Sequence, residues 1–92
     1  MEIRLYMIDA SVFSSPYGAH EAMQKVFLGY EYAGHNLDAL YDVLTSIRRD
    51  AEVRIWGIAA ARGKIGAYAD EIVTVFRAAA AHNPHLRLVV GA

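Results

Sequence analysis

The sequence predicts an α/β protein in which a small three-stranded parallel β-sheet is flanked by three to four helices. Three short segments rich in β-branched and other apolar residues alternate with longer segments whose apolar residues recur every three or four positions. Helices between consecutive strands indicate crossover connections, which join parallel strands and are right-handed. The 92 residues, 55% of them hydrophobic, have room for one core, so we expect a single domain over residues 1–92.

The three expected strands lie at residues 2–8, 53–58 and 86–90. Residues 2–8 alternate with period two but carry apolar side chains on both faces, which predicts a central strand largely covered by helices. Residues 53–58 are rich in β-branched and aromatic residues, and residues 86–90 form a closing apolar run.

The first two expected helices begin at capping residues. Ser15 is an N-cap candidate, and Pro16 stands at the first position of a helix that runs to about residue 28. Asn36 caps a second helix. The apolar stripe of this second helix consists of Leu37, Leu40, Leu44 and Ile47.

A third helix is expected from Lys64 to just before Asn83 and Pro84, because proline disfavours helical geometry in the residue before it. Residues 59–63, between the second strand and this helix, fit neither a strand nor a helix clearly. The count of flanking helices is therefore three to four.

The composition argues against several classes of protein. Cysteine is absent, which removes disulfide bonds and thiolate metal ligands and fits a reducing compartment. The first residues, MEIRLYMID, lack the basic start and apolar run of a signal peptide. The longest apolar run, residues 55–61, is far shorter than the roughly 20 residues that span a bilayer. We therefore expect a soluble, cytoplasmic protein that does not bind membranes.

Charge is distributed unevenly along the chain although the formal net charge is only −1. Residues 29–47 contain three acidic and no Lys or Arg residues, whereas residues 48–64 contain five basic residues against two acidic ones. The adjoining local balances of −3 and +3 predict a directional field at one surface.

The second expected helix carries an acidic face opposite its leucine stripe. A turn of 100° per residue places Asp38, Asp42 and Thr45 together, with Tyr41 at the edge. Asp38 lies in the first turn, where it complements the helix dipole. Asp42 lies mid-helix, where aspartate is a poor helix former, which favours a binding role.

Catalytic interpretations of the same residues have less support. Two carboxylates one turn apart can in principle act as general acid and base, but a convex exposed face lacks the cleft that perturbs catalytic pKa values. A small metal-dependent hydrolase using His35, Asp38 and Asp42 is one hypothesis of this kind. His82 and His85 have ligand-like spacing, but Pro84 breaks the helix that would align them.

The run from Tyr32 to Thr45, YAGHNLDALYDVLT, resembles the inhibitory segment of the barstar family. That segment follows the pattern Tyr-x-Gly-x-Asn-Leu-Asp-Ala-Leu-aromatic-Asp-x-Leu. Residues 75–77 also resemble the family's last helix and residues 86–90 its closing strand, whereas residues 48–64 match weakly. The likeness thus covers nearly the whole chain in the expected order.

The resemblance implies a non-catalytic inhibitor that binds one barnase-like ribonuclease inside the producing cell. It implies that Asp42 is the main anchor in the phosphate-binding pocket of the nuclease, that Asp38 supports it, and that Tyr32 packs on the active-site histidine. Tyr41 stands where the family often has tryptophan. The other implied contact residues are Gly34, Asn36, Thr45 and Ser46. No cofactor, metal ion or nucleic acid is expected, and the free chain is expected to be a monomer.

The sequence departs from the family pattern at Ala78, where the family has a glutamate that contacts the nuclease. Glu71 lies on the same helix face but about 10 Å away along the axis, too far to replace that contact. The near-neutral net charge also predicts weaker steering towards a basic enzyme. These departures leave open an immunity or antitoxin-type module for another toxin.

Overall fold

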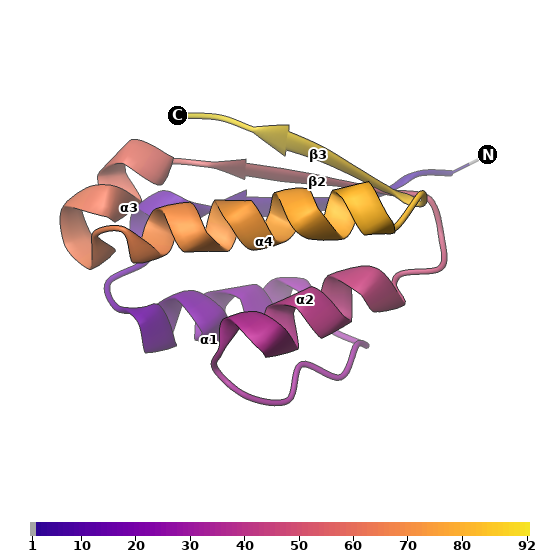
Figure 1. The fold of residues 1–92 in the computed structure, drawn as a ribbon, viewed down its shortest axis with the longest axis horizontal. Coiled ribbons are helices and arrows are strands. Elements are labelled where there is room, and N and C mark those ends of the chain that lie inside the picture. The colour runs from indigo at the N-terminus through magenta and orange to yellow at the C-terminus, as the bar shows by residue number, and fades with distance from the viewer. Residues whose placement is uncertain (1) are drawn as a thin grey trace.

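Three parallel strands form one sheet in the order β1-β2-β3 in this computed structural model, which describes residues 2–92 (Figure 1). The strands are β1 (Arg4–Asp9), β2 (Ala51–Trp56) and β3 (Leu86–Val90). β2 pairs in parallel with β1 on one side and with β3 on the other. The prediction of a three-stranded parallel sheet is confirmed.

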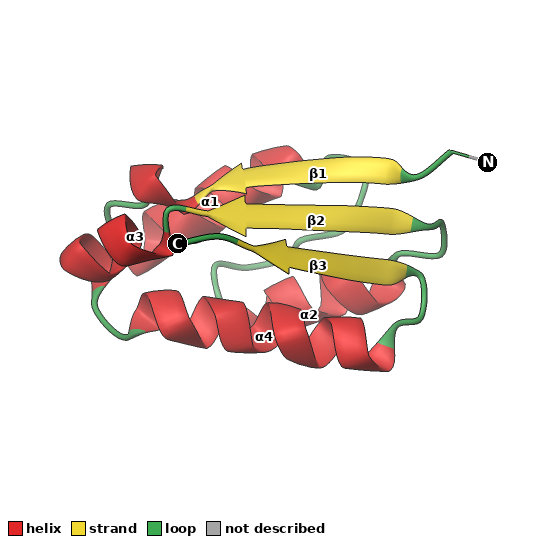
Figure 2. Cartoon of the chain, turned by 90° about the horizontal axis from the view of Figure 1, so that it is seen from above, coloured by secondary structure: helices red, strands yellow, loops and turns green. Residues whose placement is uncertain are grey.

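Four α-helices and a short 3-10 helix connect the strands within residues 2–92. The connection from β1 to β2 contains η1 (Ala10–Val12), α1 (Pro16–Val26) and α2 (Leu37–Ser46), and that from β2 to β3 contains α3 (Ile58–Ile65) and α4 (Tyr68–His82). The helices α1, α2 and α4 lie on one face of the sheet, and α3 lies beyond the carboxyl ends of the strands (Figure 1, Figure 2). This arrangement confirms the predicted α/β class.

The first strand does not have the central, covered position that its sequence predicts. β1 lies at the edge of the sheet, and the face away from the helices exposes Leu5 by 47% and Met7 by 51%, while Ile8 on the opposite face is 2% exposed. Apolar residues on both faces of a strand do not specify which face receives the helices. Because all three covering helices pack on one side, the prediction of a covered central strand is wrong.

The open face of the sheet also carries charged side chains. Arg54 Nε donates to Glu52 Oε2 at 2.5 Å, and Arg87 Nη1 lies 3.6 Å from Glu52 Oε1. These groups belong to the central strand and its β3 neighbour. Charge at the centre of an open sheet disfavours sheet-to-sheet association, because it would have to be desolvated.

The buried side chains form one continuous core between the sheet and the helices. Burial of each large apolar side chain contributes roughly 1.5–3 kcal/mol. The second helix supplies Leu40, Leu44 and Ile47 to this core as predicted, whereas Leu37 is only partly buried. The largest aromatic members are Phe13, Phe27 and Phe76.

Two glycines move the element boundaries away from the predicted ones. Gly57 adopts a φ of 76°, which ends β2 two residues before the predicted end at residue 58 and begins α3. Gly66 adopts a φ of 62° and separates α3 from α4, so Lys64 lies in the last turn of α3 instead of opening the last helix. Left-handed backbone is readily accessible to glycine, and the apolar periodicity alone did not reveal either break.

Candidate partner-binding surface

The helix α2 begins at the predicted residue. The Oδ1 atom of Asn36 accepts a hydrogen bond from the backbone N–H of Ala39 at 2.8 Å, and the φ and ψ of Asn36 are extended. A side-chain N-cap of this kind contributes about 1 kcal/mol to helix stability. Asn36 therefore fixes the start of the helix and is itself exposed to solvent.

The carboxylates of Asp38 and Asp42 stand on the exposed side of α2, one turn apart. Leu40 and Leu44 occupy the opposite, fully buried side. None of the ion pairs found among residues 2–92 includes Asp38 or Asp42. The helix thus presents two negative charges to solvent without a neutralising cation in the described part of the chain.

The hydroxyl groups at the end of α2 are bonded to the helix itself. Thr45 Oγ1 donates to the carbonyl of Tyr41 at 2.9 Å, and Ser46 Oγ donates to the carbonyl of Asp42 at 2.5 Å. Their oxygen lone pairs remain able to accept hydrogen bonds from a ligand. Tyr41 packs partly into the core, with its ring centroid 6.5 Å from that of His82.

The end of α2 is tied to the rest of the fold by a buried amide. Asn83, at the C-cap of α4, donates through Nδ2 to the carbonyls of Leu44 and Ile47, both at 2.9 Å. These two carbonyls lie in the last turn and at the C-cap of α2, where helical partners are lacking. The Asn83 side chain therefore fixes the position of the acidic helix relative to α4.

The loop before α2 projects from the helical layer on the side away from the sheet (Figure 1). Tyr32 in this loop is half-buried, and its hydroxyl lies 2.5 Å from Nδ1 of His20. Burial raises the pKa of the Tyr32 phenol. Gly34 adopts a φ of 119°, a conformation that favours glycine. Part of the Tyr32 ring faces inward, so only its remainder is open to a partner.

The structure places all the predicted contact residues on one continuous stretch, residues 32–46, in a loop and the helix that follows it. Position 78 lies on α4, the helix that packs against α2, and Ala78 is exposed there. A partner seated on α2 and extending over α4 would meet a methyl group at this position. His20 and Gln24, which contact the loop, were not predicted from the sequence. Their spacing of four residues on α1 was the available signal.

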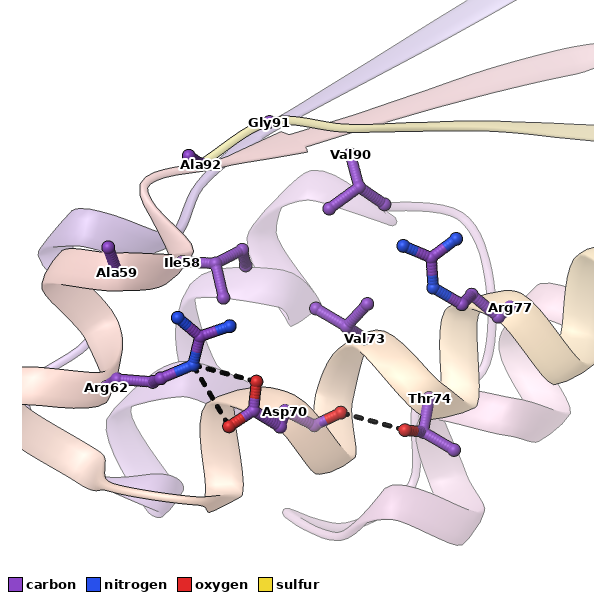
Figure 3. Close-up of a pocket in the computed structure, with 10 residues that line it drawn as sticks. All are labelled: Ile58, Ala59, Arg62, Asp70, Val73, Thr74, Arg77, Val90, Gly91 and Ala92. Atoms are coloured by element: carbon purple, nitrogen blue, oxygen red, sulfur yellow. Dashed lines mark hydrogen bonds and ion pairs between the residues drawn. The ribbon is translucent and has the colours of Figure 1, made fainter.

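The hollow drawn in Figure 3 lies between α3, α4 and the end of β3, and has a volume of about 390 Å³. Neither α2 nor the loop before it lines this hollow. Asp70 is the only acidic side chain among its lining residues, and Arg62 Nε donates to its two carboxylate oxygens at 2.8 and 3.1 Å. The carboxylate of Asp70 in this hollow is therefore already paired with Arg62.

Residues 2–92 contain neither a metal-binding cluster nor a membrane-crossing helix. In this range no group of three or more His, Cys, Asp or Glu side chains is placed to hold a metal ion. Likewise, no helix in this part of the chain has the length and apolar character needed to cross a membrane.

The structure thus combines an α/β sheet covered on one face with an exposed acidic helix and a preceding aromatic loop. The model of the family described as Barstar (barnase inhibitor) matches residues 3–90, and the chain belongs to this family. None of the curated proteins compared with the chain matches it.

Proposed function

We propose that this chain inhibits a barnase-like ribonuclease inside the producing cell, forming a one-to-one complex in which α2 and the loop before it occupy the nuclease active site. The family match supports an inhibitor role. The observation that carries the proposal is the exposed Asp42 carboxylate, which has no ion-pair partner among the described residues and lies mid-helix, where the dipole does not favour it.

The physical basis of the inhibition is mimicry of a phosphate. An active site that binds RNA presents cationic groups to an anion, and a carboxylate can accept charge-assisted hydrogen bonds from the same groups. Asp42 stands on a helix whose backbone is already fixed by Asn36 at one end and Asn83 at the other. Binding therefore requires little ordering of this helix, and more of the interaction energy remains as affinity.

The contact residues have different parts in this proposal. Asp42 is the anchor in the phosphate pocket and Asp38 adds a second negative charge one turn away. Tyr32 packs on the nuclease histidine, and Tyr41 supplies aromatic area beside the anchor. The residues that complete the contact are Gly34, Asn36, Thr45 and Ser46.

A second candidate function is immunity to a different toxin with a basic active site. The exposed Ala78 favours it, because a nuclease that uses a basic residue to meet a glutamate there would find no charge on this chain. Both candidates use the acidic helix, but they differ in the partner. Binding to a panel of barnase-like ribonucleases, followed by capture of the partner from the producing cell, separates them.

Isothermal titration calorimetry of the chain against barnase-like ribonucleases tests the first candidate. We expect a one-to-one complex with an affinity better than micromolar, which Asp42→Ala weakens by at least about 30-fold, because deleting one member of a buried interfacial charge pair costs about 2–5 kcal/mol. Glu71→Ala is the matched control, since it removes the same charge from an exposed site on α4. Equal affinities for wild type and Asp42→Ala would rule out the mechanism.

A further inference from the structure

One face of α1 holds the loop that precedes the acidic helix. Tyr17, His20 and Gln24 are spaced by three and four residues, so their side chains lie along one face of α1. The ring of Tyr17 stacks on His35 with centroids 3.9 Å apart and an interplanar angle of 5°. Gln24 Nε2 donates to the carbonyls of Tyr32 at 3.2 Å and Gly34 at 3.5 Å.

His20 is the centre of these contacts. Its side chain is completely buried, with the Tyr32 hydroxyl 2.5 Å from Nδ1 and the Tyr68 hydroxyl 2.6 Å from Nε2. A neutral imidazole donates through one nitrogen and accepts through the other, so one tyrosine accepts a hydrogen bond and the other donates one. The imidazole thereby joins α1, the loop and the first residue of α4.

We infer that His20 and Gln24 are positioning residues that hold the loop at residues 32–36 in its binding conformation before a partner arrives. The inference rests on the proposed function, because it concerns the same surface. His20 fixes the tip of the Tyr32 side chain and Gln24 fixes the backbone on either side of the turn at Gly34. Neither residue belongs to the predicted contact surface, so both act through the loop.

A loop between two helices has no backbone ladder of its own, and its residues lose conformational freedom when a partner orders them. Contacts that order the loop in the free protein remove that cost from the binding step. The His20 contact is maintained because breaking it leaves a buried ring nitrogen without a hydrogen-bond partner. The loop is therefore expected to be rigid in the free chain.

A matched pair of hydroxyl deletions tests the inference. Tyr32→Phe and Tyr68→Phe each remove one oxygen from the same imidazole, but only Tyr32 belongs to the loop. For Tyr32→Phe we expect the NMR backbone order parameters of residues 32–36 to fall from about 0.85 to below about 0.6, and affinity for the ribonuclease to fall about tenfold. For Tyr68→Phe we expect the order parameters to stay near about 0.85 and the affinity to stay within about twofold of wild type.

Two replacements of His20 provide a rescue experiment. Asparagine places a polar atom near the position of Nδ1 and can retain the bond to Tyr32, whereas glutamine reaches the position of Nε2 and can retain the bond to Tyr68. We expect His20→Asn to keep the backbone order parameters of residues 32–36 high and His20→Gln to lower them, at similar cost in stability. A purely structural role for His20 would make the order parameters follow stability in both variants.

Gln24→Ala keeps the inference testable if the buried variants fail to fold, because it removes only the partly buried amide and its two loop contacts. We expect lower backbone order parameters at residues 32–36 in this variant. Unchanged order parameters in both Gln24→Ala and Tyr32→Phe, or an equal decrease in Tyr68→Phe, would overturn the inference. Because order parameters are measured without a nuclease, failure of wild type to bind any ribonuclease would count against the proposed function alone.

Discussion

Asn83 offers the sharpest test of how the fold positions the acidic helix. Its side chain is 3% exposed and makes three hydrogen bonds with backbone groups of three different residues. Nδ2 donates to the carbonyls of Leu44 and Ile47, both at 2.9 Å, and Oδ1 accepts from the N–H of His85 at 3.0 Å. The substitution Asn83→Ala removes all three bonds and leaves their backbone partners without a side-chain ligand.

The magnitude follows from these contacts. A net contribution of about 0.5–1.5 kcal/mol for each bond gives a loss of about 3 kcal/mol for the three together. For a protein of this size, with a urea m-value of about 1.5 kcal/mol/M, that loss lowers the unfolding midpoint by about 2 M. We expect the m-value itself to stay unchanged, since the surface exposed on unfolding is the same.

Urea unfolding followed by circular dichroism measures this loss. Thr74→Ala is the control, because Thr74 Oγ1 also donates to a backbone carbonyl, that of Asp70 at 3.0 Å, but from an exposed position. We expect the control to change stability by less than about 0.5 kcal/mol. A loss below about 1 kcal/mol for Asn83→Ala would refute the reasoning that this buried amide ties α2 to α4.

Two further predictions concern His20 and Gly57. Burial and the neighbouring His35 lower the pKa of His20 below its ordinary value of 6.5, so the unfolded chain binds more protons than the folded one between the two pKa values. We therefore expect stability to fall as pH drops below about 6.5 and the His20→Gln variant to show a shallower dependence, measured as urea midpoints between pH 7.5 and 5. A Cβ on Gly57, at a φ of 76°, would lie 2.8 Å from the backbone nitrogen of Ser11, so Gly57→Ala should cost about 1–3 kcal/mol in urea unfolding. Gly63 lies in helix α3, and apart from its chain neighbours and the nearby helix backbone no atom lies within 4 Å of an added Cβ, so Gly63→Ala should instead stabilise by about 0.4–1 kcal/mol. Equal effects on stability at the two glycines would contradict the expected difference between them.

Elements with a local chemical signal were predicted correctly from the sequence. The first helix begins at Pro16 with Ser15 as its N-cap, and α2 follows the N-cap at Asn36, because capping depends on residues three positions apart. The apolar stripe of α2 was predicted from the helical periodicity of its residues, and three of its four members, Leu40, Leu44 and Ile47, are fully buried. The number and parallel direction of the strands followed from their alternation with helices.

Features set by distant parts of the chain were not predictable in this way. The position of β1 at the sheet edge depends on where the helices pack, and residues 2–8 do not encode that choice. The break at Gly66 depends on a backbone conformation that periodicity does not report. Glycine inside a helical pattern was the one local sign of it.

The candidate surface was predicted because it is a continuous segment, residues 32–46, whose residues share a recognisable pattern. Its support was not predicted. His20 lies 12 residues before Tyr32 and 48 residues before Tyr68, and only the folded chain brings the three side chains together. The sequence therefore predicts which residues face a partner, but it does not predict the contacts of His20 with the loop.

The central claim is that the acidic helix blocks a ribonuclease active site, and an inhibition titration tests it most directly. RNA hydrolysis by a barnase-like ribonuclease is measured while the chain is added from zero to a tenfold molar excess. We predict that activity falls in proportion to the added chain and is abolished near one equivalent, whereas Asp42→Ala leaves most of the activity at that point. Undiminished hydrolysis at tenfold excess of the wild-type chain, across the panel of ribonucleases, would contradict the account.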